Sequence, residues 1–178
     1  RIHKSQSVNA KAVGIDFRKT LRLLAKIKKV TGALLLLTLL QTVVLSIAVV
    51  GPGFAENILK IRVEEFPVLF ITPSVIGMGI GAILLGNFFH KVSKRFMVRL
   101  GMFIIGLSLL ASPYVLSFAG SNIIYAAVTL AFFMGIAFAL IFIPANTVVQ
   151  QETSDQMRGK VYGVLNTLVG GVSIIPVL

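Results

Sequence analysis

The chain is dominated by apolar runs that are long enough to cross a lipid bilayer. The first covers residues 30–54 and holds no charged side chain, and four more follow at 67–89, 96–118, 122–149 and 161–178. A helix of about 20 mostly apolar residues spans the hydrocarbon core of a membrane. We therefore expect an all-α membrane protein, a helical bundle with five spans over these ranges, the last of them truncated.

Few charges are available for a water-facing surface. Asp, Glu, Lys and Arg make up 13% of the residues, against about 25% in soluble domains, and 56% are hydrophobic. The net charge of +11 could suggest nucleic-acid binding, but the positive residues sit at the ends of the apolar runs and no recognition element is visible. We expect a lipid bilayer as a partner and no nucleic acid.

The first 29 residues are polar and basic, unlike the rest of the chain. Asp16 can cap a helix in which apolar residues such as Phe17 and Leu21 recur at helical spacing between Lys and Arg. This pattern predicts a linker over 1–29 with an amphipathic helix at about 16–28. The helix either lies on an anionic membrane surface or packs as a solvated linker helix on a neighbouring domain.

Lys and Arg alternate in number between successive connections. Nine precede the first run, and the next four connections hold two, four, none and two. Cytoplasmic loops of membrane proteins are enriched in Lys and Arg. The alternation predicts that the N-terminal segment and loops 90–99 and 151–160 are cytoplasmic, in a multi-pass protein of the cell (inner) membrane.

The stretch "GNFFHKVSKR", Gly86–Arg95, ends the second run in a basic loop. It resembles the cytoplasmic signature G-x-L-a-D-r-x-G-r-k of the major facilitator superfamily of secondary transporters, in the copy found in the C-terminal half. Gly86 matches the first glycine, and the basic positions are matched by Lys91, Lys94 and Arg95. His90 stands where the family has its acid and Ser93 where it has its second glycine, so the resemblance carries over no charge-relay role.

Further stretches match the same family in order along the chain. "GIDFRKTLRLLAKIKKV" resembles its amphipathic linker, "VVGPGFAENIL" the outer end of its seventh helix, and "PANTVVQQETSDQMRGKVYGVLNTL" its tenth helix, loop and eleventh helix. The nearest subgroup is the bacterial drug- and macrolide-efflux type. The resemblance implies a partial C-terminal half of a twelve-helix fold, with substrate bound at midplane against a missing N-terminal half of the same protein.

The resemblance implies a secondary active transporter that works by alternating access. We expect efflux of a small-molecule, amphipathic substrate in exchange for protons, as in an antiporter, and no flux through this half alone. The alternative is a non-transporting accessory or scaffold membrane protein, which a complete native chain of only five or six helices would favour.

Polar side chains inside the runs are the candidates for substrate contact. Gln41 lies near the middle of the first run, where a polar group is costliest in hydrocarbon. It either faces a watery cavity or makes an interhelical hydrogen bond. The cavity candidates are Thr38, Gln41, Thr42 and Asn166, and the gating or loop candidates are Gly86, His90, Lys91, Lys94, Arg95, Asn146, Arg158 and Gly159.

Other features have two interpretations each. Gly77 and Gly81, extended by Gly79, either let two helices rock against each other or pack them statically. His90 is a proton sensor or a solvated loop residue. Arg158 contacts acidic groups or helix ends in a gate, or it anchors a phosphate head group.

Catalytic chemistry has little support in the sequence. No Asp or Glu lies well inside any run, so a proton-coupling carboxylate lies in the missing half or the coupling is different. Cysteine is absent, and no Ser/His couple or pair of acids gathers at membrane depth. We therefore expect no enzyme activity, no catalytic residue, no metal site and no cofactor.

Overall fold

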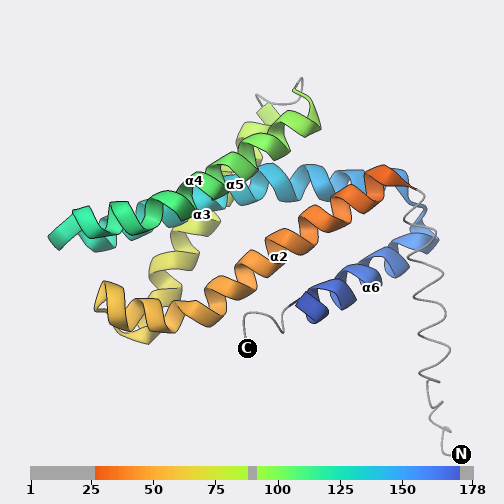
Figure 1. Ribbon diagram of the computed structural model, residues 1–178. Coiled ribbons are helices and arrows are strands. Elements are labelled where there is room, and N and C mark those ends of the chain that lie inside the picture. The colour runs from red at the N-terminus through yellow and green to blue at the C-terminus, as the bar shows by residue number, and fades with distance from the viewer. Residues whose placement is uncertain (1–26, 88–91, 173–178) are drawn as a thin grey trace, which may run out of the picture.

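The computed structural model describes residues 27–87 and 92–172, which form an all-helical bundle (Figure 1). In chain order the elements are α2 (Lys28–Phe54), a π-helical turn η1 (Ala55–Leu59), η2 (Val63–Glu65), α3 (Phe66–Asn87), α4 (Lys94–Ala119), η3 (Gly120–Asn122), α5 (Ile123–Glu152) and α6 (Asp155–Val172). The expected all-α fold is confirmed. Most of the expected linker and its helix at 16–28 lie outside the described residues, as does the end of the fifth expected run.

Three stretches of the described chain are long and apolar enough to cross a membrane. They are Lys28–Leu59, Val63–Asn87 and Lys94–Glu152. The third folds back on itself at η3, where Gly120 has a φ of 52°, and so contains the antiparallel helices α4 and α5. A positive φ is readily adopted by glycine because it has no Cβ.

Helix α6 begins at Asp155, inside the loop expected at 151–160. The backbone N–H groups of Met157 and Arg158 already donate to the Ser154 carbonyl oxygen, which closes the first turn. An acidic residue in the first turn is favourable because the N-terminal end of a helix carries a partial positive charge. Helix α6 therefore includes polar residues of the expected loop in addition to the apolar run expected from residue 161.

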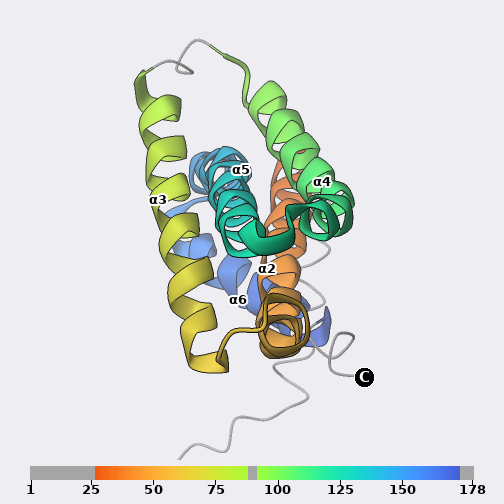
Figure 2. The same ribbon diagram turned by 90° about the vertical axis from the view of Figure 1, so that its left-hand side faces the viewer.

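Helix α5 is the centre of the bundle. It packs against α2, α3 and α4, and Figure 2 shows α3 and α4 on either side of it. Small buried residues recur along α5 at every fourth position: Ala127, Ala131, Gly135 and Ala139. Residues at this spacing share one face of a helix, and small side chains there let a neighbouring backbone approach closely.

The close approach is made to α3. A Cβ added to Gly77 would collide with the carbonyl oxygen of Phe132, and one added to Gly135 would collide with that of Ser74. Gly81 is also tight but less so, since its added Cβ would lie 2.8 Å from the Ala139 side chain. Gly77 and Gly81 thus pack closely against α5, and whether the two helices rock or are static at this crossing stays a prediction.

The glycine between them takes no part in this crossing. An added Cβ at Gly79 would meet no atom within 4 Å, so this residue faces away from α5. The Ser74 hydroxyl also lies at this crossing, where its one proton is shared between the Phe70 carbonyl oxygen of α3 at 2.7 Å and the Ala131 carbonyl oxygen of α5 at 3.0 Å. Hydrogen bonds of this kind between membrane helices contribute about 0.6 kcal/mol on average.

Helices α2 and α6 lie side by side and meet the last turns of α5 (Figure 1). The buried core between the three helices contains Val30, Ala33, Leu34, Leu37, Ala145, Val149, Val161 and Val164. Polar residues of the same three helices lie next to this core, since Asn146 follows Ala145 on α5 and Tyr162 follows Val161 on α6.

Candidate functional site

A cavity of about 480 Å³ lies between α2, α5 and α6. Each of the three helices contributes polar groups to its wall, and these are Gln41, Asn146, Tyr162 and Asn166. The other lining residues are apolar side chains and Gly170, and within the described chain no charged side chain lines the cavity. Two of the four cavity residues expected from the sequence, Gln41 and Asn166, therefore meet here.

The side-chain amides of Gln41 and Asn166 are exposed within this cavity. Gln41 lies halfway along α2, and Asn166 follows Tyr162 by one turn on the same face of α6. Neither amide forms a hydrogen bond with another side chain in the part of the chain that the structure describes. An amide without a partner at membrane depth is costly, so both groups are suited to bind water or a ligand.

Asn146 and Tyr162 are joined across the cavity wall. The Tyr162 hydroxyl donates a hydrogen bond of 2.8 Å to Asn146 Oδ1, and Asn146 Nδ2 donates to the Phe142 carbonyl oxygen at 3.2 Å. Tyr162 did not stand out in the sequence. The available signal was its spacing, because Tyr162 precedes Asn166 by four residues and so shares its face of the helix. A tyrosine on such a face usually finds a hydrogen-bond partner for its hydroxyl.

Thr38 and Thr42 do not line the cavity. Thr38 is buried, and its hydroxyl donates to the Leu34 carbonyl oxygen at 2.8 Å. The Thr42 hydroxyl donates to the Thr38 carbonyl oxygen, also at 2.8 Å. Both hydroxyls are thus satisfied within their own helix, and substrate contact by either threonine stays a prediction.

A second, apolar cavity of about 550 Å³ lies next to the first, between α2, α3 and α5. Leu40 and Phe138 line both cavities and separate them. The apolar cavity continues along α2 to Pro52 and is also lined by Phe66 and Phe70, whose ring centroids lie 4.5 Å apart. Together the two cavities form a polar chamber and an apolar chamber along one side of α5.

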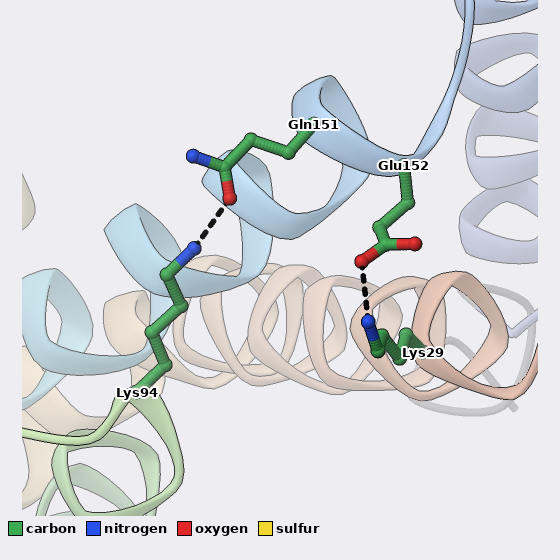
Figure 3. Close-up of polar contacts among 4 residues, drawn as sticks. All are labelled: Lys29, Lys94, Gln151 and Glu152. Atoms are coloured by element: carbon green, nitrogen blue, oxygen red, sulfur yellow. Dashed lines mark hydrogen bonds and ion pairs between the residues drawn. The ribbon is translucent and has the colours of Figure 1, made fainter.

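The last turn of α5 joins three other helices. Lys29 of α2 pairs with Glu152 at 2.7 Å, and Lys94 of α4 donates to Gln151 at 2.6 Å (Figure 3). Arg158 of α6 donates to the Gln150 carbonyl oxygen at 2.8 Å. Three consecutive residues of α5 therefore hold the starts of α2, α4 and α6 at the same end of the bundle.

Arg158 contacts other residues of the described chain, and its role in a gate or as a head-group anchor stays a prediction. The guanidinium binds the carbonyl end of α5 and forms an ion pair with Asp155, so it contacts a helix end and an acidic group. Its neighbour Gly159 makes no close approach, because an added Cβ there would meet nothing within 4 Å, and the same holds at Gly163.

The basic loop motif is described in part. His90 and Lys91 lie outside the described residues, and Gly86 has open space around its Cα. Ser93, which stands where the family has a glycine, caps α4, because its hydroxyl accepts from the Phe96 backbone N–H at 3.4 Å. Arg95 is exposed, whereas Lys94 turns toward α5.

Membrane-length apolar helices beside a cavity with uncharged polar groups define a multi-pass membrane protein. The family model of the Major Facilitator Superfamily matches residues 3–176, and the chain belongs to this family of membrane transporters. Comparison with curated proteins and with solved structures found no match. The family expected from the sequence is thus confirmed, and with it a transporter in a lipid bilayer.

Proposed function

We propose that the chain is the C-terminal half of a secondary active transporter that exports small amphipathic compounds in exchange for protons. The observation that carries the proposal is the polar cavity between α2, α5 and α6, with the Gln41 and Asn166 amides at its surface. Uncharged hydrogen-bonding groups in a largely apolar wall are typical of sites that orient small ligands. They suit a ligand with an uncharged polar group.

The neighbouring apolar cavity is the reason for proposing an amphipathic substrate. Its wall is apolar apart from Ser74, and it meets the polar cavity at Leu40 and Phe138. A molecule with a polar group near Gln41 could place an apolar body beyond Leu40. The stacked rings of Phe138 and Phe142, 5.3 Å apart, offer flat apolar surface at this junction.

In alternating access, the substrate cavity lies between two halves of the transporter, and this chain supplies one of them. We propose that the N-terminal half of the same protein faces Gln41 and Asn166 and closes the cavity, so residues 1–178 alone carry no flux. The end of the bundle held by Gln150–Glu152, with the loop of Gly86–Arg95, is then the cytoplasmic gate. The N-terminal segment lies in the cytoplasm on this proposal, and the membrane is the inner cell membrane.

Proton coupling needs a carboxylate that the described helices do not place at membrane depth. Their acids lie in short turns or at helix ends: Glu56, Glu64, Glu65, Glu152 and Asp155. The proposal therefore assigns the coupling carboxylate to the other half of the protein.

The test is export of a fluorescent amphipathic dye from cells that express the intact polypeptide. We expect faster dye loss than from cells with an empty vector, arrest of the loss by a protonophore, and slower loss with Gln41→Leu or Asn166→Leu. Thr167→Val is the matched control, because the Thr167 hydroxyl donates to the Gly163 carbonyl oxygen of its own helix and Thr167 lines neither of the two cavities described above. Absence of any flux would favour an accessory membrane protein, and flux that ignores the protonophore would remove proton coupling alone.

A further inference from the structure

One face of α4 points away from the rest of the bundle. Met97 and Gly101 are buried against α5, whereas Phe103 and Leu110 on the other side are 66% and 75% exposed. Residues three, four and seven positions apart share a face of a helix. The face that begins with Arg95 and Arg99 therefore continues through Phe103, Gly106 and Leu110, and we call it the outer face of α4.

The two guanidinium groups at the start of the outer face are exposed and have no acidic partner among the described residues. The first turn of α4 contains no acid either. The neighbouring Lys94 is also exposed but differs, because its ammonium group donates to Gln151 at the end of α5. The basic pair of the loop motif is thus divided, since Lys94 is paired with α5 and Arg95 has no acidic partner in the described chain.

The order of groups along the outer face matches the depth profile of one membrane leaflet. At 1.5 Å per residue, Arg99 lies about 8 Å and Leu110 about 24 Å along the helix from Lys94. The distance from Arg99 to Leu110 is then about 17 Å, close to half of the ~30 Å hydrocarbon core. If α4 crosses the membrane, the guanidinium groups reach head-group level, and the residues from Phe103 to Leu110 lie beside acyl chains of the same leaflet.

The apolar part of the outer face has a glycine at its middle. Gly106 is half-buried, and a Cβ added to it would meet no atom within 4 Å, so no side chain of the described chain packs at the Cβ position. Gly106 lies between the exposed side chains of Phe103 and Leu110. A flexible hydrocarbon chain fits such a surface better than a rigid partner does.

We propose that the outer face of α4 binds an anionic phospholipid, with its phosphate between Arg95 and Arg99 and an acyl chain along Phe103, Gly106 and Leu110. Guanidinium groups bind phosphate in a bidentate manner and are always charged. A zwitterionic phosphatidylcholine is held less well, because its choline group carries a compensating positive charge. The site does not depend on the substrate or the direction of transport.

The test uses the absence of tryptophan from residues 1–178, and any tryptophan elsewhere in the intact polypeptide is replaced by phenylalanine. Phe103→Trp introduces a single indole on the outer face, and the protein is reconstituted in vesicles that contain brominated phosphatidylglycerol or brominated phosphatidylcholine at equal mole fraction. Bromine quenches the indole on contact, so the ratio of quenching gives the relative affinity of the two lipids at this position. We expect a preference for phosphatidylglycerol of about fivefold for each guanidinium group.

Three comparisons make the result specific. Arg95→Gln with Arg99→Gln should remove the preference, whereas Lys28→Gln, which removes an exposed cation from α2, should leave it unchanged. Phe118→Trp, at the other end of α4 where the side chain is 87% exposed, should show equal quenching by both lipids. If the double Gln variant does not insert, Arg95→Lys with Arg99→Lys should still reduce the preference, because lysine cannot bind phosphate in a bidentate manner.

The proposal is overturned if both lipids quench the indole of the Phe103→Trp protein equally with both arginines present. It is also overturned if the Lys variants keep the full preference, since diffuse charge attraction would then suffice. Loss of the preference on addition of inorganic phosphate would show a site for free phosphate rather than for a lipid.

Discussion

The hydroxyl of Tyr162 on α6 donates a hydrogen bond of 2.8 Å to Asn146 Oδ1 on α5. Asn146 in turn donates to the Phe142 carbonyl oxygen, so its amide is held in one orientation. The contact joins two helices within the wall of the polar cavity. It leaves Gln41 and Asn166 as the amides of that wall with no side-chain partner in the described chain.

Tyr162→Phe should loosen α6 from α5. Removal of the hydroxyl loses one interhelical hydrogen bond, and we expect the free energy of unfolding to fall by about 0.6–1.5 kcal/mol. Denaturation by increasing SDS in mixed micelles measures the change. Tyr125→Phe is the matched control, because Tyr125 is 75% exposed and should tolerate the loss of its hydroxyl. An equal effect of the two substitutions would contradict the prediction.

Gly77→Ala and Gly79→Ala should have opposite effects on stability. Alanine is favoured over glycine inside a helix by about 0.5–1 kcal/mol, so Gly79→Ala, with open space around it, should be neutral or stabilising. Gly77→Ala places a methyl group against the Phe132 carbonyl oxygen and should cost about 1–3 kcal/mol. Denaturation by SDS in mixed micelles measures the stability of both variants. A Gly77→Ala protein as stable as the unchanged protein would mean that α3 and α5 do not cross at this point.

Gln41→Cys should react with a water-soluble, membrane-impermeant maleimide. Residues 1–178 contain no cysteine, so once any cysteine elsewhere in the polypeptide is replaced by serine, each single substitution adds one thiol to label. Thiols react with maleimide as thiolates, which form in water but not in hydrocarbon. Leu39→Cys is the depth-matched control, because Leu39 is 51% exposed two residues away on a different face of α2. We expect the Gln41→Cys protein to be labelled more than the Leu39→Cys protein. The reverse result would mean that the cavity is not accessible to water.

Reversal of the Lys29–Glu152 ion pair should be compensated by a second reversal. The Lys29 side chain is 71% exposed, so the pair is expected to contribute at most about 1 kcal/mol. Lys29→Glu should lower thermal stability at low salt, and addition of Glu152→Lys should restore it. High salt should remove the difference by screening. Lys28→Glu is the control for the effect of a reversed charge at the start of α2. If the thermal stability of the Lys29→Glu, Glu152→Lys double variant does not recover, the two residues do not interact.

Much of the helical architecture could be predicted because it depends on local properties. An apolar run of membrane length favours a helix wherever it lies, and α2 to α5 lie over the first four such runs. Family membership could be predicted for a similar reason, since the motifs occur in a fixed order along the chain. Ser93 shows the limit, because its role as the cap of α4 depends on the exact turn at which that helix begins.

The candidate site could be predicted only in part. Gln41 and Asn166 stood out as polar residues in apolar runs, and both line the polar cavity. Thr38 and Thr42 stood out for the same reason, but their hydroxyls bond within α2. Threonine can satisfy its hydroxyl on the preceding turn, whereas the longer amide side chains reach away from their own helix. Tyr162 entered the site only through its contact with Asn146.

The sequence by itself determined which segments are helical, where the charges interrupt them and which family the chain resembles, because each follows from residues close together in the chain. Only the tertiary structure decided which surfaces meet. It placed the small residues of α5 against Gly77 and Gly81, and it brought Lys29 to Glu152 across 123 positions. Such contacts depend on how helices pack in three dimensions, and side-chain periodicity states only which residues share a face, not which neighbour that face will meet.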